Sequence, residues 1–238
     1  MIVYGSNTIR ACLEAKKLKK VMVSKGFSNH NLIEEIQNQG IQIKYASKEE
    51  LDKLAKGGNH QSIIGEIDDV RLYGLDEILR TCSDSKSQKD VPILVILDSL
   101  TDPHNLGAIL RSCDAFNVSG VIYKKHGSVG LNDTVAKVST GAINFVKCCE
   151  VTNLTRAIQE IKKHGFWVVG LDGAGEKEVK ETAKNTPICL VVGSEGYGIS
   201  RLVRENCDYL EKIEMFGRVN CLNASVACSI ALYALRNL

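Results

Sequence analysis

Apolar runs alternate with amphipathic stretches along most of the chain, and this alternation predicts an α/β fold. Three runs, at 93–98, 166–172 and 188–193, are almost continuously apolar, as expected for parallel strands that are covered on both faces. The amphipathic stretch 153–165 between two of them ends in a glycine, a common helix stop. We therefore expect a mostly parallel sheet in the second part of the chain.

The first part of the chain has shorter elements. Strands are predicted at 21–25, 41–46 and 62–67, with an amphipathic helix at 31–40. The later segment "SDSKSQKD" is polar and precedes Pro92, which is typical of a linker. We therefore predict a small α/β domain over residues 1–67, a linker over 68–91 and a larger α/β domain over 92–238.

The final stretch, 223–238, has a helical pattern with apolar residues on all sides. Such a helix is expected to be buried, either in the core or at an interface between subunits.

Charge changes this picture little. The chain of 238 residues has a net charge of +2, which permits a nucleic-acid partner without requiring one. Residues 1–67 hold ten Lys and Arg against seven Asp and Glu, so the first domain is slightly basic. The basic run 16–20 is predicted to be the solvated face of a helix.

The nine cysteines have no C-x-x-C spacing, and several lie inside apolar runs. We interpret them as reduced thiols of a cytoplasmic protein. Neither these cysteines nor the five histidines have the spacing of a zinc site, so no metal is expected. The chain has no run of 18 apolar residues, and we predict no membrane span.

Three segments with unusual polar residues follow predicted strands. They are "LDSLTDPHNLGAILRS", "LVVGSEGYGIS" and "IEMFGRVNCLNASVA". Because ligands of open α/β sheets bind beyond the carboxyl ends of the strands, these segments are the candidate site.

Each of these segments also has a plain structural interpretation. Asn105 could be the N-cap of a helix, and Arg111 could be a solvated surface arginine instead of a group that binds phosphate or carboxylate. Glu195 among glycines has no evident packing role. The glycine-rich segments 170–175 and 193–198 lack the G-x-G-x-x-G spacing, which disfavours a nicotinamide-dependent enzyme.

Together, the three segments resemble the three sequence motifs of the SpoU/TrmH (SPOUT) family of RNA ribose 2′-O-methyltransferases, across roughly residues 92–238. Residues 1–67, with "YGSNTIRACLEA" near the start and "GGNHQSIIGEI" at the end, resemble the L30e-like substrate-binding domain of the same family. The two-domain layout is most similar to the RlmB-type branch, which methylates a guanosine in large-subunit (23S) rRNA.

The resemblance implies a SPOUT α/β-knot fold, in which a deep trefoil knot forms in the mostly parallel sheet. It also implies a homodimer through the knot and the last helix. S-adenosyl-L-methionine would bind in the knot, largely through backbone groups at Gly193, Ile213 and Leu222.

The resemblance further implies roles near the reacting ribose for Asn105, Arg111, Glu195, Cys221 and Asn223. An arginine does not lose its proton in proteins, so we expect Arg111 to bind a backbone phosphate and not to act as a base. An RNA substrate would meet the first domain and the basic residues Lys124, Lys125 and His126; no DNA partner is expected.

The chain departs from the family pattern in three places. Cys221 replaces a serine, Glu214 replaces a proline and Ser62 replaces a glycine. A thiol is a weaker hydrogen-bond donor than a hydroxyl, so Cys221 is expected to slow turnover without abolishing cofactor binding. Two alternatives stay open, a tRNA guanosine 2′-O-methyltransferase and a catalytically weakened RNA-binding or ribosome-assembly factor.

Overall fold

The computed structural model describes the chain except residues 84–90, 176, 179–185 and 237–238. The chain divides into two compact units. The first comprises Met1–Val70 with Leu131–Phe145, and the second comprises Arg71–Gly130 with Val146–Leu238. The segment Leu131–Phe145 thus packs with the first unit, although the sequence interpretation assigns it to the second domain. The domain boundaries stay a prediction, and most of the expected linker segment "SDSKSQKD" lies outside the described residues.

The first unit contains a mixed sheet with the strand order β1-β4-β2-β3. Strand β4 is antiparallel to both of its neighbours, and β2 is parallel to β3. The strands are β1 (Ile2–Tyr4), β2 (Leu18–Ser24), β3 (Gln42–Ala46) and β4 (Ile63–Ile67). The helices are α1 (Ser6–Glu14), α2 (His30–Asn38), α3 (Lys48–Leu54) and α6 (Asp133–Val138), with a 3₁₀ turn, η1 (Ala142–Asn144).

The basic run 16–20 is not the helix face that its charges predict. Strand β2 begins at Leu18, whose side chain is buried. Lys19 and Lys20 are exposed and pair with Asp68 and Glu66. The prediction is therefore wrong, because one buried leucine among lysines is as compatible with the start of a strand as with a helix.

The second unit contains a seven-stranded sheet with the order β7-β6-β5-β10-β8-β11-β9, and all neighbouring strands are parallel. The strands are β5 (Ile93–Leu97), β6 (Gly120–Lys124), β7 (Cys148–Val151), β8 (Trp167–Leu171), β9 (Lys177–Glu178), β10 (Ile188–Val192) and β11 (Tyr209–Lys212). All five residues of β5 and of β10 are buried. The expected α/β class with a parallel sheet is confirmed.

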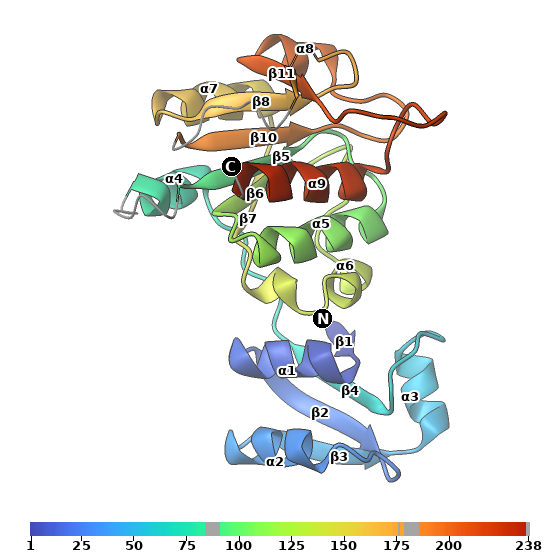
Figure 1. Cartoon of the computed structure of the whole chain (residues 1–238). Coiled ribbons are helices and arrows are strands. Elements are labelled where there is room, and N and C mark those ends of the chain that lie inside the picture. Colours follow the sequence, from blue (N-terminus) through green and yellow to red (C-terminus); the bar gives the residue numbers. More distant parts are fainter. Residues whose placement is uncertain (84–90, 176, 179–185, 237–238) are drawn as a thin grey trace. The chain divides into compact units, whose positions relative to one another are not determined.

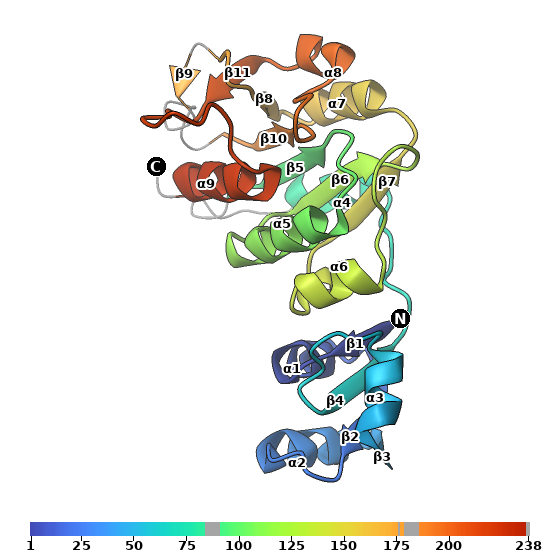
Figure 2. The ribbon, with the colours of Figure 1, turned by 90° about the vertical axis from the view of Figure 1, so that its right-hand side faces the viewer.

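Helices cover both faces of this sheet (Figures 1 and 2). On one face, α4 (Leu75–Ser83), α7 (Leu154–Lys163) and α8 (Arg201–Glu205) share a core with the strands. On the other face lie α5 (Pro103–Ala115) and α9 (Ala224–Arg236). Helix α4 falls within the predicted linker, but its Ile78 and Leu79 are fully buried. The linker prediction is therefore wrong for α4, whose apolar face is needed by the core.

Helix α9 is held along its length by polar contacts with α5 and its surroundings. The hydroxyl oxygens of Ser112 and Ser229 lie 2.7 Å apart. At the far end, the Arg236 guanidinium donates hydrogen bonds to the backbone carbonyls of Phe116, Asn117 and Val91. These contacts hold α9 against α5 and its surroundings, which matters because the candidate site lies at the start of α9.

The expectation that α9 is buried holds for one of its faces. Ala224, Cys228, Ala231 and Leu232 are buried, whereas Val226, Ile230 and Tyr233 are 40–59% exposed. No helix among the described residues is long and apolar enough to cross a membrane.

Candidate active site at the carboxyl edge of the parallel sheet

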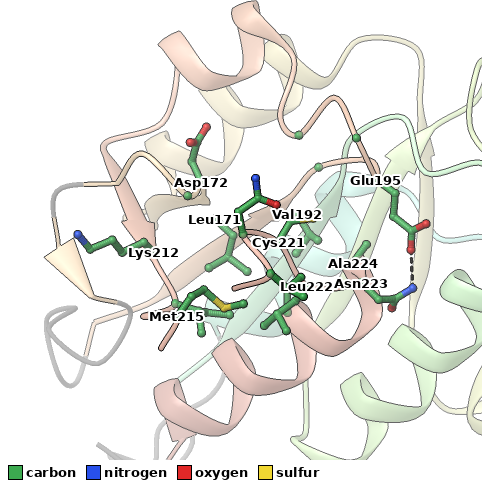
Figure 3. Close-up of a pocket in the computed structure, with 18 of the residues that line it drawn as sticks. Leu171, Asp172, Val192, Glu195, Lys212, Met215, Cys221, Leu222, Asn223 and Ala224 are labelled. Carbon is green, nitrogen blue, oxygen red and sulfur yellow. Dashed lines mark hydrogen bonds between the residues drawn. The ribbon is translucent and has the colours of Figure 1, made fainter. Parts of the chain in front are cut away.

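A cavity of about 1020 Å³ opens where β8, β10 and β11 end (Figure 3). Its walls are formed by residues that directly follow these strands, and by the irregular segment that leads into α9. Gly193, Ile213 and Leu222, the three predicted cofactor-binding residues, all line this cavity. The fold therefore brings them together from distant parts of the sequence, while their role stays a prediction.

Three polar side chains form a closed hydrogen-bonded group at one side of the cavity, which we call the Asn105–Glu195–Asn223 cluster. The Asn105 Nδ2 donates to Glu195 Oε1 at 2.8 Å. The Asn223 Nδ2 donates to Asn105 Oδ1 at 2.9 Å and also to Glu195 Oε1. Figure 3 shows Glu195 and Asn223 pointing toward each other. The sequence interpretation predicts all three residues for the site, and the structure joins them.

Asn105 is held in place by helix α5. The helix is capped by Asp102, whose side chain accepts a hydrogen bond from the His104 backbone N–H at 2.8 Å, and Pro103 occupies its first turn. The alternative that Asn105 is the N-cap is therefore wrong, because a proline in the first turn sets the cap one position before it. Asn105 is 5% exposed, and because its side chain does not cap the helix, its amide group can form the hydrogen bonds of the cluster.

Asn223 has two functions at the start of α9. Its Oδ1 accepts hydrogen bonds from the backbone N–H groups of Ser225 and Val226, at 2.9 and 3.3 Å, and from the Ser225 hydroxyl. These bonds satisfy donors that the first turn of a helix leaves unpaired. Since the oxygen is committed to the helix, the amide nitrogen must point toward Glu195 and Asn105.

Glu195 stands on a tight turn that continues from β10. The turn is closed by two backbone hydrogen bonds between Ser194 and Gly198, at 2.9 and 3.1 Å. Gly196 and Gly198 have φ angles of 84° and 65°, which glycine adopts without strain. Glu195 Oε1 accepts both amide groups, and Oε2 accepts no hydrogen bond from the described residues. The carboxylate thus presents one oxygen to a hydrogen-bond donor outside the protein.

Asp98 supports this turn, and the sequence interpretation missed its role. It directly follows β5 and is only 3% exposed. Its Oδ2 accepts the Ser200 backbone N–H at 2.7 Å, and its Oδ1 accepts the Ser99 hydroxyl at 3.0 Å. A carboxylate immediately after a buried strand was the available signal. Asp98 fixes the end of the Glu195 turn against the neighbouring strand.

Arg111 is not part of the cluster. It lies on α5 six residues after Asn105, an offset that turns its side chain to a different side of the helix. Its guanidinium is exposed and makes no hydrogen bond or ion pair within the described residues. An exposed cation without a protein partner is available for an external anion.

Two of the residues that depart from the family pattern lie in the cavity wall. Cys221 and Glu214 line the cavity and are exposed. All nine cysteines are free thiols, and Cys221 is the exposed one among them. Burial raises the pKa of the Cys12 and Cys149 thiols to about 11, and that of Cys148 to about 12. Cys221 is therefore the accessible thiol at the candidate site.

The parallel sheet with helices on both faces, and a cavity with convergent polar groups beyond its strand ends, are typical of α/β proteins that bind a ligand at the carboxyl edge of the sheet.

Comparison with known proteins gives the family. Residues 92–233 match the model of the SpoU rRNA Methylase family, and residues 2–73 match that of RNA 2′-O ribose methyltransferase substrate binding. The chain belongs to the SpoU rRNA methylase family.

Similar proteins extend over the whole chain. A putative TrmH family tRNA/rRNA methyltransferase of Bacillus subtilis is 39% identical over 97% of this chain and 93% of its own length. A 23S rRNA (guanosine-2′-O-)-methyltransferase of Neisseria meningitidis is 37% identical over 97% of this chain and 92% of its own. The fold matches the crystal structure of the SpoU methyltransferase AviRb from Streptomyces viridochromogenes with the cofactor AdoMet; the TM-score is 0.80, identity is 21%, and the match covers 100% of this chain and 89% of that one.

Proposed function

We propose that this protein transfers a methyl group from S-adenosyl-L-methionine to the ribose 2′-hydroxyl of a guanosine in large-subunit (23S) rRNA. The observation that carries this proposal is the Asn105–Glu195–Asn223 cluster beside the cavity, with Glu195 Oε2 open toward an incoming hydroxyl. The choice of RNA is supported by the name of the Neisseria meningitidis relative, which spans the whole chain.

The cavity suits the proposed cofactor. Its wall contains Gly193, Ile213 and Leu222 together with apolar residues such as Val192 and Met215, and it also includes the acidic residues Asp172 and Glu214. Backbone groups can pair with an adenine edge, and carboxylates suit ribose hydroxyls and a cationic centre. The sulfonium supplies an already activated methyl group.

The protein's own contribution is to position the nucleophile. Glu195 Oε2 is the acceptor that would hold the 2′-hydroxyl proton, while Asn105 and Asn223 keep the carboxylate in one orientation. Since an oriented nucleophile loses little further entropy on the way to the transition state, such a fixed carboxylate contributes directly to the rate.

Arg111 is proposed to bind an RNA phosphate and to stabilise the charge that develops on the hydroxyl oxygen. We expect Arg111→Lys to lower the methyl-transfer rate about 10-fold and Arg111→Ala about 100-fold, because lysine keeps the charge but lacks the planar pair of donors. Single-turnover rates on RNA measure both effects. Near-normal turnover of the lysine variant would contradict a role for the guanidinium fork, and Arg201→Lys on α8 is the matched control.

The accessible thiol gives a direct measure of cofactor binding. Iodoacetamide is expected to modify Cys221 at least about 10-fold faster than Cys12, whose pKa of about 11 leaves little reactive thiolate. Because Cys221 lines the cavity, cofactor at ten times its Kd should slow this modification about 10-fold. Peptide mass spectrometry follows each site. An unchanged rate at Cys221 with saturating cofactor would place the cofactor elsewhere.

The exposed Val226, Ile230 and Tyr233 on α9 are the face through which two copies would form a homodimer.

Lys124 and Lys125 at the end of β6, with His126, are exposed and would meet the RNA together with the first unit. The trefoil knot stays a prediction, as does a location in the cytoplasm, where the free thiols would remain reduced.

A second candidate substrate is tRNA, which the printed name of the Bacillus subtilis relative also includes. The deciding experiment is transfer of tritiated methyl groups to 23S rRNA and to tRNA, both lacking 2′-O-methyl marks, by the wild type and by Cys221→Ser. We expect incorporation at one guanosine of 23S rRNA and a faster serine variant. Incorporation into tRNA alone would reverse the choice of substrate. An inert wild type beside an active serine variant would identify an RNA-binding or ribosome-assembly factor.

A further inference from the structure

Two aromatic rings stand out by their exposure. Among the described residues, Tyr197 and Phe216 are the most exposed of the large hydrophobic side chains, at 95% and 89%. Leaving an aromatic ring in water forgoes the favourable free energy that its burial would supply. Rings this exposed are therefore candidates for contact with a ligand.

Both rings stand on loops that form the cavity. Tyr197 lies in the turn closed by Ser194 and Gly198, two residues after Glu195, and its neighbours Gly196 and Gly198 line the cavity. Phe216 lies in the segment between β11 and α9, and its neighbours Met215 and Gly217 also line the cavity. Neither ring is itself in the wall. The two rings thus stand at the rim of the cavity, Tyr197 two residues after Glu195 and Phe216 next to Met215.

The surroundings of the rings favour nucleic-acid bases over a protein partner. Tyr197 lies between two glycines, whereas Phe216 lies between Met215 and Gly217 in a loop that also exposes Val219. Arg218 follows two residues after Phe216, is exposed, and makes no ion pair within the described residues. Exposed rings at a cavity rim, with a cation close to one of them, suit unpaired RNA, in which bases stack on rings and cations contact phosphates. The continuous apolar strip on α9 suits a protein partner better.

We propose that Tyr197 and Phe216 stack on bases beside the nucleotide at the site, and that the protein binds its RNA as an unpaired segment. This proposal deepens the proposed function and rests on it for the choice of RNA as the ligand. It predicts that the RNA around the modified nucleotide must be single-stranded when it binds, because a base within a duplex has no free face to offer.

The test is direct RNA binding, measured without methyl transfer. Fluorescence anisotropy gives the Kd of the full-length protein for a labelled unpaired 12-nucleotide RNA and for a duplex of the same composition. Tyr197→Ala and Phe216→Ala are each expected to weaken binding of the unpaired RNA about 5- to 30-fold, since base–aromatic stacking is lost. Tyr197→Phe and Phe216→Tyr keep a ring and should bind within about 2-fold of the wild type. Leu202→Ala, which removes an exposed apolar side chain from α8, is the matched control.

Three results would overturn the proposal. These are alanine variants that bind unpaired RNA as the wild type does, a wild type that prefers the duplex, and alanine variants that change the oligomeric state in sedimentation velocity. The last result would assign the rings to a contact between protein copies. Methyl transfer is measured in a separate assay. Ring-dependent binding of unpaired RNA without any methyl transfer would refute the proposed function and leave the stacking contact standing.

Discussion

Replacing Glu195 with glutamine is expected to lower the methyl-transfer rate about 100- to 1000-fold while the protein stays folded. The carboxylate accepts two amide N–H groups on Oε1 and leaves Oε2 free. Glutamine has one oxygen where the carboxylate has two, so it can serve the amide groups or a ribose hydroxyl but not both. The rate is measured in single turnovers at saturating cofactor and RNA, so that chemistry is separated from binding.

The control for this prediction is Glu205→Gln, an exposed glutamate on α8 that pairs with Arg201. It removes the same charge from a residue that belongs neither to the cluster nor to the cavity wall, and should leave the rate within about 2-fold. Because Glu195 and Asn223 share a hydrogen bond, the double variant with Asn223→Ala should lose little more activity than Glu195→Gln alone. Additive losses would mean that the two residues act independently, and a normal rate for Glu195→Gln would exclude the carboxylate from catalysis.

The sequence predicts the strands well where both faces of a strand are buried. The strands β5, β8 and β10 consist almost entirely of apolar residues, because helices cover both of their faces. Prediction fails where burial is partial. Strand β2 contains two exposed lysines, so its first residues are interpreted as part of a helix face, although a strand is predicted at 21–25. Helix α4 buries a single face next to a polar segment and is interpreted as part of a linker.

The sequence likewise predicts only part of the candidate site. That Asn105, Glu195 and Asn223 lie at strand ends can be inferred from the sequence, but their mutual hydrogen bonds cannot. Glu195 is 90 positions from Asn105, and Asn223 is 28 positions from Glu195. The meeting depends on the strand order, in which β5 and β10 are neighbours although β6, β7, β8 and β9 lie between them in the sequence. The local sequence pattern contains no information about this order, and only the family resemblance predicts that the three residues lie near one ribose.

Asp98 and Gly193 show what resemblance also leaves out, namely why the turn keeps its shape. Asp98 holds one end of the turn through the Ser200 backbone N–H. At the other end, a Cβ atom added to Gly193 would lie 2.1 Å from the carbonyl carbon of Gly198 and 2.3 Å from the backbone nitrogen of Ile199. Contacts this short involve backbone atoms, which no change of side-chain rotamer can relieve. Gly193 is therefore required for the two ends of the turn to meet.

We accordingly expect Gly193→Ala to destabilise the second unit by about 2 to 3 kcal/mol and to lower Tm by about 4 to 12 °C. Forcing the turn open also moves Glu195 and the cavity wall, so cofactor affinity should fall at least about 100-fold. Calorimetry measures both quantities on the same samples. Gly173→Ala is the matched control, because Gly173 lines the same cavity and its added Cβ would have no atom within 4 Å. Equal behaviour of the two alanine variants would show that the close approach at Gly193 does not shape the site, whereas loss confined to Gly193→Ala ties cofactor binding to the geometry of this turn.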